Sequence, residues 1–377
     1  MFYREAGQFR TSYAQDAQIL PLRQDRWGMA ALLVAAFVIV PYVANDYWLS
    51  AILIPWLILS LVALGQNILM GYAGQLSLGS AGFMAAGAFA CYNLILRVDG
   101  TPFIVAVLLS GVCAALIGIV FGLPSLRIRG LYLAVATLAS QFFIVWALDK
   151  FGWFKNYDPS GVITAQQIVI FGHPFTSPQE KYWVVLVIVA VLALAAKNMA
   201  RGSTGRAWMA VRDMDVAAEV MGLSLLRTKL LAFAISSFYC GVGGALFAFA
   251  YLQTVEPSAF NIDLSFRILF MIIIGGIGTI VGSFLGAGFI LLMPVFLNVF
   301  FHAVFGQAVD ATIISAFEQV IFGAMIIMFL IFEPLGLARL WQLTKERLRL
   351  GTFLVLGFTI ALSGFAPRRY AEEQLEA

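Results

Sequence analysis

Residues 103–123 read FIVAVLLSGVCAALIGIVFGL, an apolar run without a single charged side chain. A helix that crosses a bilayer needs about 20 consecutive, mostly apolar residues, and this run is long enough. Similar runs recur along the chain, because 62% of its 377 residues are hydrophobic and only 11% are charged. Soluble domains carry about 25% charged residues. The composition therefore excludes a soluble enzyme and predicts an all-α polytopic membrane protein.

Apolar runs of this length predict about ten transmembrane helices. The expected spans are 28–45, 50–70, 78–96, 103–123, 130–149, 182–200, 229–251, 265–282, 284–301 and 314–333. They divide the chain into an N-terminal segment (1–27), a membrane domain (28–337) and a C-terminal tail (338–377). The tail holds a short apolar segment, 351–366, which is marginal for spanning and is expected to pack at the membrane surface.

The basic residues predict the orientation of these spans, because Lys and Arg concentrate in cytoplasmic connections. Arg127 and Arg129 lie between the fourth and fifth spans, and a larger basic group lies within 197–229. Both groups are cytoplasmic when the N-terminus is cytoplasmic, and ten spans then return the C-terminus to the same side. The exceptions on the opposite side are Arg97, Lys150, Lys155 and Lys181.

The sequence holds few of the groups that catalysis or metal binding would need. No Walker A pattern, GxxxxGK[ST], occurs, so this chain is not expected to hydrolyse ATP through a P-loop. The three cysteines lie within apolar runs and the two histidines are isolated, which predicts neither a metal site nor a bound cofactor. The basic residues lie in short connections, so they indicate topology rather than a nucleic-acid partner.

The spans contain almost no charged residues, whereas ion-coupled carriers usually keep such residues inside them. We therefore expect a transport subunit, not an enzyme, that takes its energy from another protein. An ion-coupled secondary transporter stays open as the alternative from a different class.

Residues 203–222, STGRAWMAVRDMDVAAEVMG, predict one short amphipathic helix on the cytoplasmic side. Thr204 is expected to cap its start, and Gly222 is expected to end it in the left-handed conformation. A charged helix held on this face suits docking into a partner's cleft. On the pattern alone, an ordinary surface helix is an equal alternative.

Two glycine-rich segments interrupt the apolar pattern, GYAGQLSLGSAG (71–82) and residues 275–288. Broken helices at similar places in two halves are a sequence indication of a transport pathway, because unwound backbone in a membrane must line a cavity or be buried in protein. Close packing of helices is the alternative, and the four-residue spacing of Gly278, Gly282 and Gly286 suits it. The expected path residues are Gln75, Ser77, Gly79, Ser80, Gly82, Gly275, Gly276 and Gly278.

Four stretches carry a resemblance to a known family: GYAGQLSLGSAGFMAAGAFA (71–90), LPSLRIRGLYLAVATLA (123–139), GRAWMAVRDMDVAAEVMGLSLLRTKLLAFAISSFYCGVGGALFA (205–248) and MIIIGGIGTIVGSFLGA (271–287). In order and spacing they resemble the permease subunits of branched-chain amino acid ABC importers, in particular the LivM type. The likeness covers roughly residues 50–337.

The resemblance implies a multi-pass subunit of a bacterial inner membrane that forms half of a translocation path. Its implied partners are a LivH-type permease subunit, two cytoplasmic ABC ATPases that use ATP and Mg, a periplasmic solute-binding protein and the membrane lipid. The implied solute is small and polar, such as a branched-chain or related amino acid. Urea, short amides and aromatic or dicarboxylic acids are the alternatives within the class.

The resemblance also makes the helix at about 203–224 similar to the family's coupling helix. Ala217, Ala218 and Gly222 match the EAAxxxG loop of ABC importer permeases, although Val216 replaces its Glu. Two further departures, Ser80 in place of a common His and NYDPSG (156–161) in place of TGGxxG, leave the solute open. The residues expected to couple to the ATPase are Arg206, Arg212, Asp213, Asp215, Ala217, Ala218 and Gly222.

Overall fold

The computed structural model describes residues 23–98, 100–125, 131–158, 162–170 and 172–305. It also describes positions 317, 320–321, 323–324, 327–328 and 331, and the helical stretch 336–344. Residues 1–22, most of the predicted tenth span (314–333) and the apolar segment 351–366 lie outside the described residues.

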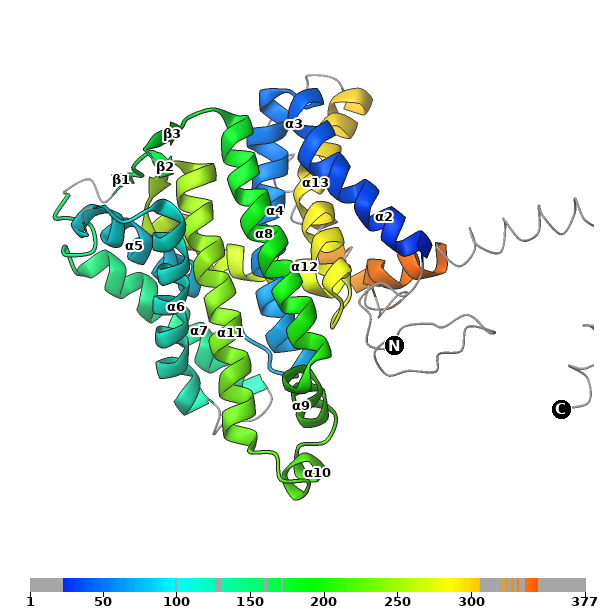
Figure 1. Ribbon diagram of the computed structural model, residues 1–377. Helices are drawn as coiled ribbons and strands as arrows, with labels where there is room; N and C mark the ends of the chain where they lie inside the picture. Colours follow the sequence, from blue (N-terminus) through cyan, green and yellow to red (C-terminus); the bar gives the residue numbers. More distant parts are fainter. Residues whose placement is uncertain are drawn as a thin grey trace, which may run out of the picture.

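The described chain is mostly helical, and its helices follow the predicted spans closely (Figure 1). The first apolar run forms α2 (Arg23–Val34), η1 (Ala35–Ile39) and α3 (Val40–Val43), and the second forms η2 (Trp48–Leu53), α4 (Ile54–Asn67) and η3 (Ile68–Tyr72). The following elements are α5 (Ser80–Arg97), α6 (Phe103–Ser125), α7 (Leu131–Lys150), α8 (Pro178–Arg201), α9 (Ser203–Asp213), α10 (Asp215–Val220), α11 (Leu225–Leu246), η4 (Phe247–Leu252), η5 (Pro257–Phe260), α12 (Ile262–Gly275) and α13 (Ile280–Phe305).

Seven of the helical stretches in the described residues are long and apolar enough to cross a membrane. The eighth predicted span, 265–282, is not continuous, because α12 ends at Gly275 and α13 begins at Ile280. At a rise of 1.5 Å per residue α12 is about 21 Å long, which is shorter than the hydrocarbon core of about 30 Å. The chain therefore contains a helix that ends within the membrane domain.

Short strands add to the predicted helices. In the described residues β1 (Ile163–Thr164) pairs antiparallel with β4 (Thr254–Val255), and β2 (Ile168–Ile170) pairs with β3 (His173–Phe175). Strands β1, β2 and β3 lie at one end of the molecule and α9 and α10 at the other (Figure 1). The long connection before α8 and the connection between α8 and α11 thus face opposite sides of the helical bundle.

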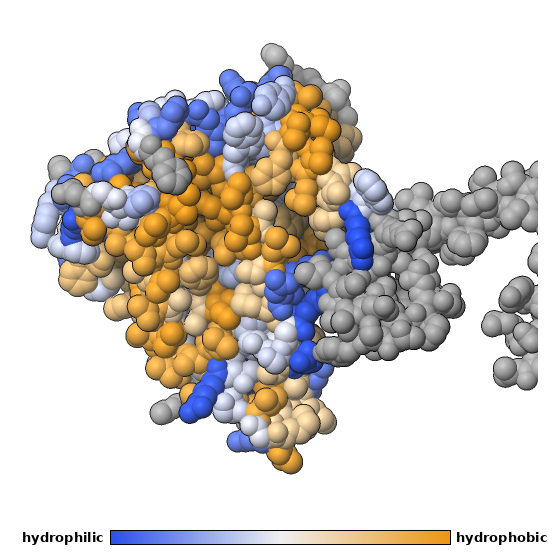
Figure 2. Space-filling model, in the orientation of Figure 1, coloured by the Kyte–Doolittle hydropathy of each residue, from blue (hydrophilic) through white to orange (hydrophobic). Residues whose placement is uncertain are grey.

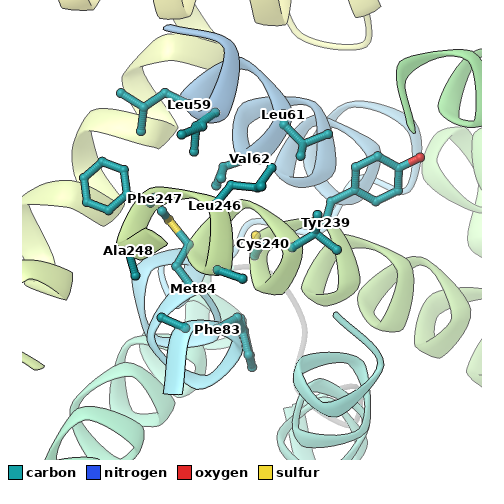
Figure 3. Close-up of a cluster of buried hydrophobic side chains, with 14 of the residues drawn as sticks. Leu59, Leu61, Val62, Phe83, Met84, Tyr239, Cys240, Leu246, Phe247 and Ala248 are labelled. Carbon is teal, nitrogen blue, oxygen red and sulfur yellow. The ribbon is translucent and has the colours of Figure 1, made fainter. Parts of the chain in front are cut away.

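The core of the bundle lies around α11, which packs against α4, α5 and α6. Figure 3 shows Val62 of α4, Met84 of α5 and Leu246 of α11 gathered in one apolar cluster. Gly87 allows α5 to approach α11 very closely, because a Cβ at this position would overlap the backbone of Gly241. Small residues at such crossings let membrane helices pack backbone to backbone.

The outer surface between the two ends is apolar (Figure 2). Large side chains on α6, α7 and α8 point outward there, among them Leu116, Val120, Val135 and Val191. A soluble monomer rarely exposes an apolar surface of such extent, and lipid would cover it. The described chain is that of a multi-pass membrane protein.

Candidate functional site

The helical bundle is interrupted at both glycine-rich segments. We call residues 73–79, between η3 and α5, the first break, and residues 276–279, between α12 and α13, the second break. The predicted interruptions, 71–82 and 275–288, are too wide, since the chain is helical again from Ser80 and from Ile280. The difference arises because hydropathy and glycine content mark a region, whereas the unwinding itself is confined to a few residues.

The structure places all the predicted path residues at or beside these two breaks. Gln75, Ser77 and Gly79 lie in the first break, with Ser80 and Gly82 in the first turn of α5. Gly276 and Gly278 lie in the second break, and Gly275 is the last residue of α12. Gly282 and Gly286 serve the close packing that their spacing predicted, because a Cβ on either would overlap backbone atoms of α12.

The second break contacts the end of η3, just before the first break, at Gly278 and Gly71. A Cβ on Gly71 would overlap the backbone N and Cα of Gly278, so the two segments are in direct backbone contact. Gly278 has a φ of 77° and Gly74 a φ of 69°, the left-handed region in which a side chain is strained. Glycine is therefore required here both for the turn of the chain and for the close approach.

Asn67 joins the end of α4 to the second break. Its Oδ1 accepts a hydrogen bond from the N–H of Gly278 at 2.8 Å, and its Nδ2 donates to the carbonyl of Thr279 at 2.8 Å. Nδ2 also lies 3.0 Å from the hydroxyl of Ser283 in α13. Asn67 is fully buried, so these bonds satisfy polar groups that water does not reach.

Side chains of other helices bind the first break and the start of α5. The Nε2 of Gln66 donates to the carbonyl of Ser77 at 2.5 Å, and the hydroxyl of Thr137 accepts from the N–H of Leu78 at 2.9 Å. Gln141 accepts from the N–H of Gly82. These bonds replace those that the unwound backbone has lost.

Two polar side chains of the site have no such partners. Within the described part of the chain, both amide atoms of Gln75 and the hydroxyl of Ser80 are buried and make no hydrogen bond. Leaving a buried polar group unpaired costs about 1–3 kcal/mol. Gln75 and Ser80 are therefore the groups of the site with unused hydrogen-bonding capacity.

The predicted single helix over 203–222 is wrong, because this segment forms two helices. Met214, with φ −153° and ψ 96°, separates α9 from α10. The N-cap of α9 is Gly202, so Thr204 does not cap it as predicted. Gly222 has a φ of 87°, so its predicted left-handed conformation after the helix is confirmed.

Buried residues attach α9 to the bundle. Trp208 is fully buried, and its indole N–H donates to the carbonyl of Thr228 in α11 at 3.1 Å. Gly205 lies against the backbone of Ala200 at the end of α8, where a Cβ would not fit. We call residues 203–222 the docking segment, and its first helix is thus held on two sides.

Both arginines of the docking segment contact their own chain. Arg206 donates to the carbonyl of Arg201 at 3.2 Å. Arg212 forms an ion pair with Asp213 and donates from Nη1 to the carbonyl of Gly71 at 2.7 Å. The predicted coupling role of Arg212 stays a prediction, and the structure adds a bond to the last turn of helix before the first break. Asp215, Ala217 and Ala218 lie on α10, where Ala218 is buried and Ala217 exposed.

Apolar side chains form the outward tip of the docking segment. Met214, Val216, Val220 and Met221 are 71%, 65%, 84% and 71% exposed. Figure 2 shows apolar atoms at the end of the molecule where α10 lies. Sequence reasoning missed this tip, although Val216 and Val220, spaced four residues apart, fall on the helix face away from the buried Ala218.

Sequence reasoning also missed the polar residues that hold the breaks. They are Gln66, Asn67, Thr137, Gln141 and Ser265. Each lies within a predominantly apolar stretch, and a polar side chain in such a stretch is the signal that could have marked them.

None of the described residues form a group of three His, Cys, Asp or Glu side chains that could hold a metal ion. The site instead consists of backbone groups, amides and hydroxyls beside one arginine. Such an arrangement can change conformation and offer uncharged hydrogen bonds.

Comparison with known proteins agrees with this architecture. The chain is 28% identical over 313 residues to the LivM permease proteins of the high-affinity branched-chain amino acid transport systems of Salmonella typhimurium and Escherichia coli, covering 77% of this chain and 69% of each relative. A probable LivM permease of Methanocaldococcus jannaschii is 21% identical, covering 77% of this chain and 92% of the relative. No solved structure matches the chain.

The family match covers the helices that build both breaks and the docking segment. Residues 48–330 match the family described as branched-chain amino acid transport system / permease component. The chain therefore belongs to the family of branched-chain amino acid transport system permease components.

Proposed function

We propose that this chain is the LivM-type permease subunit of an ABC importer in a bacterial inner membrane, with both termini cytoplasmic and about ten spans. It forms half of the path for branched-chain or related amino acids. The other half is a LivH-type permease subunit, a periplasmic binding protein delivers the solute, and two ABC ATPases supply the energy from ATP and Mg.

The apolar tip of the docking segment carries this proposal. Four large apolar side chains project from the end of the molecule, past the apolar outer surface that lipid covers. Exposed apolar patches of this kind mark protein interfaces. We infer that the tip inserts into a cleft of the ATPase, and that the family's coupling helix corresponds to α9 and α10.

The breaks support the transport half of the proposal. Unwound backbone inside a membrane domain is typical of transporter sites, and the spare polar groups of Gln75 and Ser80 suit transient hydrogen bonds to a passing solute. Movement of the docking segment by the ATPases would separate the breaks and switch access from one side to the other.

A paired substitution tests the docking step. Val220→Glu places a charge in the tip, and Val169→Glu makes the same change on exposed β2 at the opposite end. Burying a valine side chain contributes about 1.5–3 kcal/mol, so Val220→Glu should weaken ATPase association by about tenfold or more. Val169→Glu should leave co-purification of the ATPase unchanged. Equal association of both variants would contradict docking through the tip.

Reconstitution tests the energy source and the solute. In proteoliposomes the complete complex should take up labelled leucine only with ATP and binding protein, and the chain alone should take up none under a proton or sodium gradient. Gradient-driven uptake by the chain alone would establish the ion-coupled alternative. Competition by urea, phenylalanine or succinate instead of isoleucine would reassign the solute within the class.

A further inference from the structure

The docking segment and both breaks meet at one side chain, that of Arg212. Resting on the function proposed above, we propose that Arg212 is a positioning residue that transmits movement of the docking segment to the meeting point of the breaks. It does so by bonding the permease's own backbone, and not by binding the ATPase.

The contacts of Arg212 place it between α9 and the breaks. Its Nη1 donates to the carbonyl of Gly71 at 2.7 Å. Its Cγ packs against Gly74, since a Cβ built on Gly74 would lie only 2.8 Å from this atom. Its Nη1 lies near Gly278, where a Cβ would be 3.9 Å away. One side chain from α9 thus contacts the first break and reaches the second, although Arg212 is 141 residues from Gly71 in the sequence.

The carbonyl of Gly71 needs this partner because the helix before the break unwinds. In a continued α-helix the N–H of Gln75 would donate to Gly71, but it donates to Leu69 at 3.0 Å. The N–H of Ala73 donates to Ile68. A guanidinium is always protonated and only donates hydrogen bonds, which makes it a constant partner for a carbonyl left over at a break.

Asp213 sets the direction of the guanidinium. Its Oδ1 accepts from Nε of Arg212 at 2.8 Å and lies 2.8 Å from Nη2. Occupying these two nitrogens leaves Nη1 for Gly71, in the fork geometry that arginine offers and lysine lacks. A movement of α9 would therefore displace the donor that is hydrogen-bonded to the carbonyl of Gly71.

Asn67 continues the connection into the second break. Gly71 touches Gly278, and Gly278 is hydrogen-bonded to Asn67. Direct contacts thus lead from Arg212 in α9 to Gly71, and from Gly71 to Gly278. They join the docking segment to both breaks. Loosening Arg212 should release the first break from α9 while leaving the apolar tip intact.

Arg206 provides a matched control. It lies on the same helix and carries the same charge, but it donates to Arg201 at the end of α8 and not to a break. Arg212→Gln and Arg206→Gln each remove one positive charge from the docking segment, so a difference between them reports the contact with Gly71.

The experiment compares both variants in the complete complex with its ATPases and binding protein. We expect Arg212→Gln to retain ATPase association and ATP hydrolysis while leucine imported per ATP falls about tenfold, a size typical of coupling between two sites. Any loss of import by Arg206→Gln should be matched by a loss of ATPase association, because Arg206 contacts the end of α8 and not a break. Arg212→Lys keeps the charge without the fork, so its import of leucine per ATP should lie between that of Arg212→Gln and that of the unaltered complex. It replaces Arg212→Gln if that variant does not accumulate.

Hydrogen exchange separates transmission from a merely structural role. In the unaltered complex, exchange of amides in 71–79 and 276–280 should change when ATP binds, and in Arg212→Gln this change should be lost although nucleotide still binds. Persistence of the change, or normal import by Arg212→Gln, would overturn the proposal.

Loss of ATPase association by Arg212→Gln, to the extent caused by Val220→Glu, would also overturn it, because Arg212 would then be an interface residue. That result would leave the proposed function standing. If the unaltered chain associated with no ATPase, the proposed function itself would be contradicted.

Discussion

The side chain of Asn67 accepts a hydrogen bond from the N–H of Gly278, which lies 2.8 Å away and 211 residues further along the chain. This bond joins the end of α4 to the break between α12 and α13. Because the partner is a backbone group, the contact depends on the shape of the second break and not on the identity of a second side chain.

Replacing this amide should destabilise the protein. Asn67→Ala leaves the N–H of Gly278 and the carbonyl of Thr279 without their partner, at about 1–3 kcal/mol for each buried group. Thermal unfolding of the protein in detergent should occur at a lower temperature. Ser60→Ala is the control, since the hydroxyl of Ser60 in α4 is buried and has no hydrogen-bond partner among the residues that the structure describes. Equal unfolding temperatures for the two variants would show that the hydrogen bonds of Asn67 do not stabilise the protein.

A methyl group at the meeting point of the breaks should disturb transport. Gly71→Ala forces a Cβ into the backbone of Gly278, and overpacking of this kind costs about 1–3 kcal/mol. Leucine uptake by the complex should fall even where the protein still folds. Gly28→Ala in α2 has open space around it and should be neutral or slightly stabilising, because alanine favours the helix by up to about 1 kcal/mol. Uptake by Gly71→Ala equal to that of Gly28→Ala would show that the contact is dispensable.

The start of α5 should depend on Gln141. This side chain accepts from Gly82 and from the hydroxyl of Ser265, and it donates to the carbonyl of Phe260 at 3.0 Å. Gln141→Met keeps much of the volume but leaves these groups unpaired, at about 1–3 kcal/mol each. Phe142→Met, at an outward-facing neighbour, should shift stability by less than about 0.5 kcal/mol. Unfolding in denaturant distinguishes the two, and equal stability would contradict a supporting role of Gln141.

Accessibility tests whether the breaks line a path. Ser77 and Ser80 are buried in the structure. In a chain whose native cysteines are replaced by alanine, Ser77→Cys and Ser80→Cys should resist a hydrophilic thiol reagent at rest. Both should react once the complete complex hydrolyses ATP with solute present. Gln166→Cys, on the exposed connection before α8, should react in every state. Cysteines at 77 and 80 that stay inert throughout would show that the segment only packs helices.

The sequence predicts the positions of most helices because length and hydropathy alone define a membrane span. The run 103–123 becomes α6, Phe103–Ser125, almost without change. The same rule fails at 265–282, where Gly276 adopts a φ of 119°. Hydropathy gives no sign of this turn, and the glycines at 275–278 mark its region without fixing where the helix ends.

The site could be predicted only in part. Glycine content located both breaks, but their contact depends on how α4 and α12 pack, which no local pattern records. The contact of Arg212 with Gly71 could not be predicted for the same reason, since the carbonyl that it binds is 141 residues away. The docking segment divides into two helices at Met214, where no glycine or proline indicates a helix end.

The anchoring of Trp208 determines how small a movement of the docking segment breaks the bond between Arg212 and Gly71. Trp208 is hydrogen-bonded to Thr228, and Arg212 lies four residues beyond it on the same helix, so a tilt of α9 about Trp208 would move Arg212. That lever arm is about 6 Å long, so a tilt of about 10° shifts the guanidinium by about 1 Å. Such a shift lengthens the 2.7 Å bond to Gly71 past hydrogen-bonding range. A tilt of α9 by about 10° is therefore sufficient to break the bond between Arg212 and Gly71.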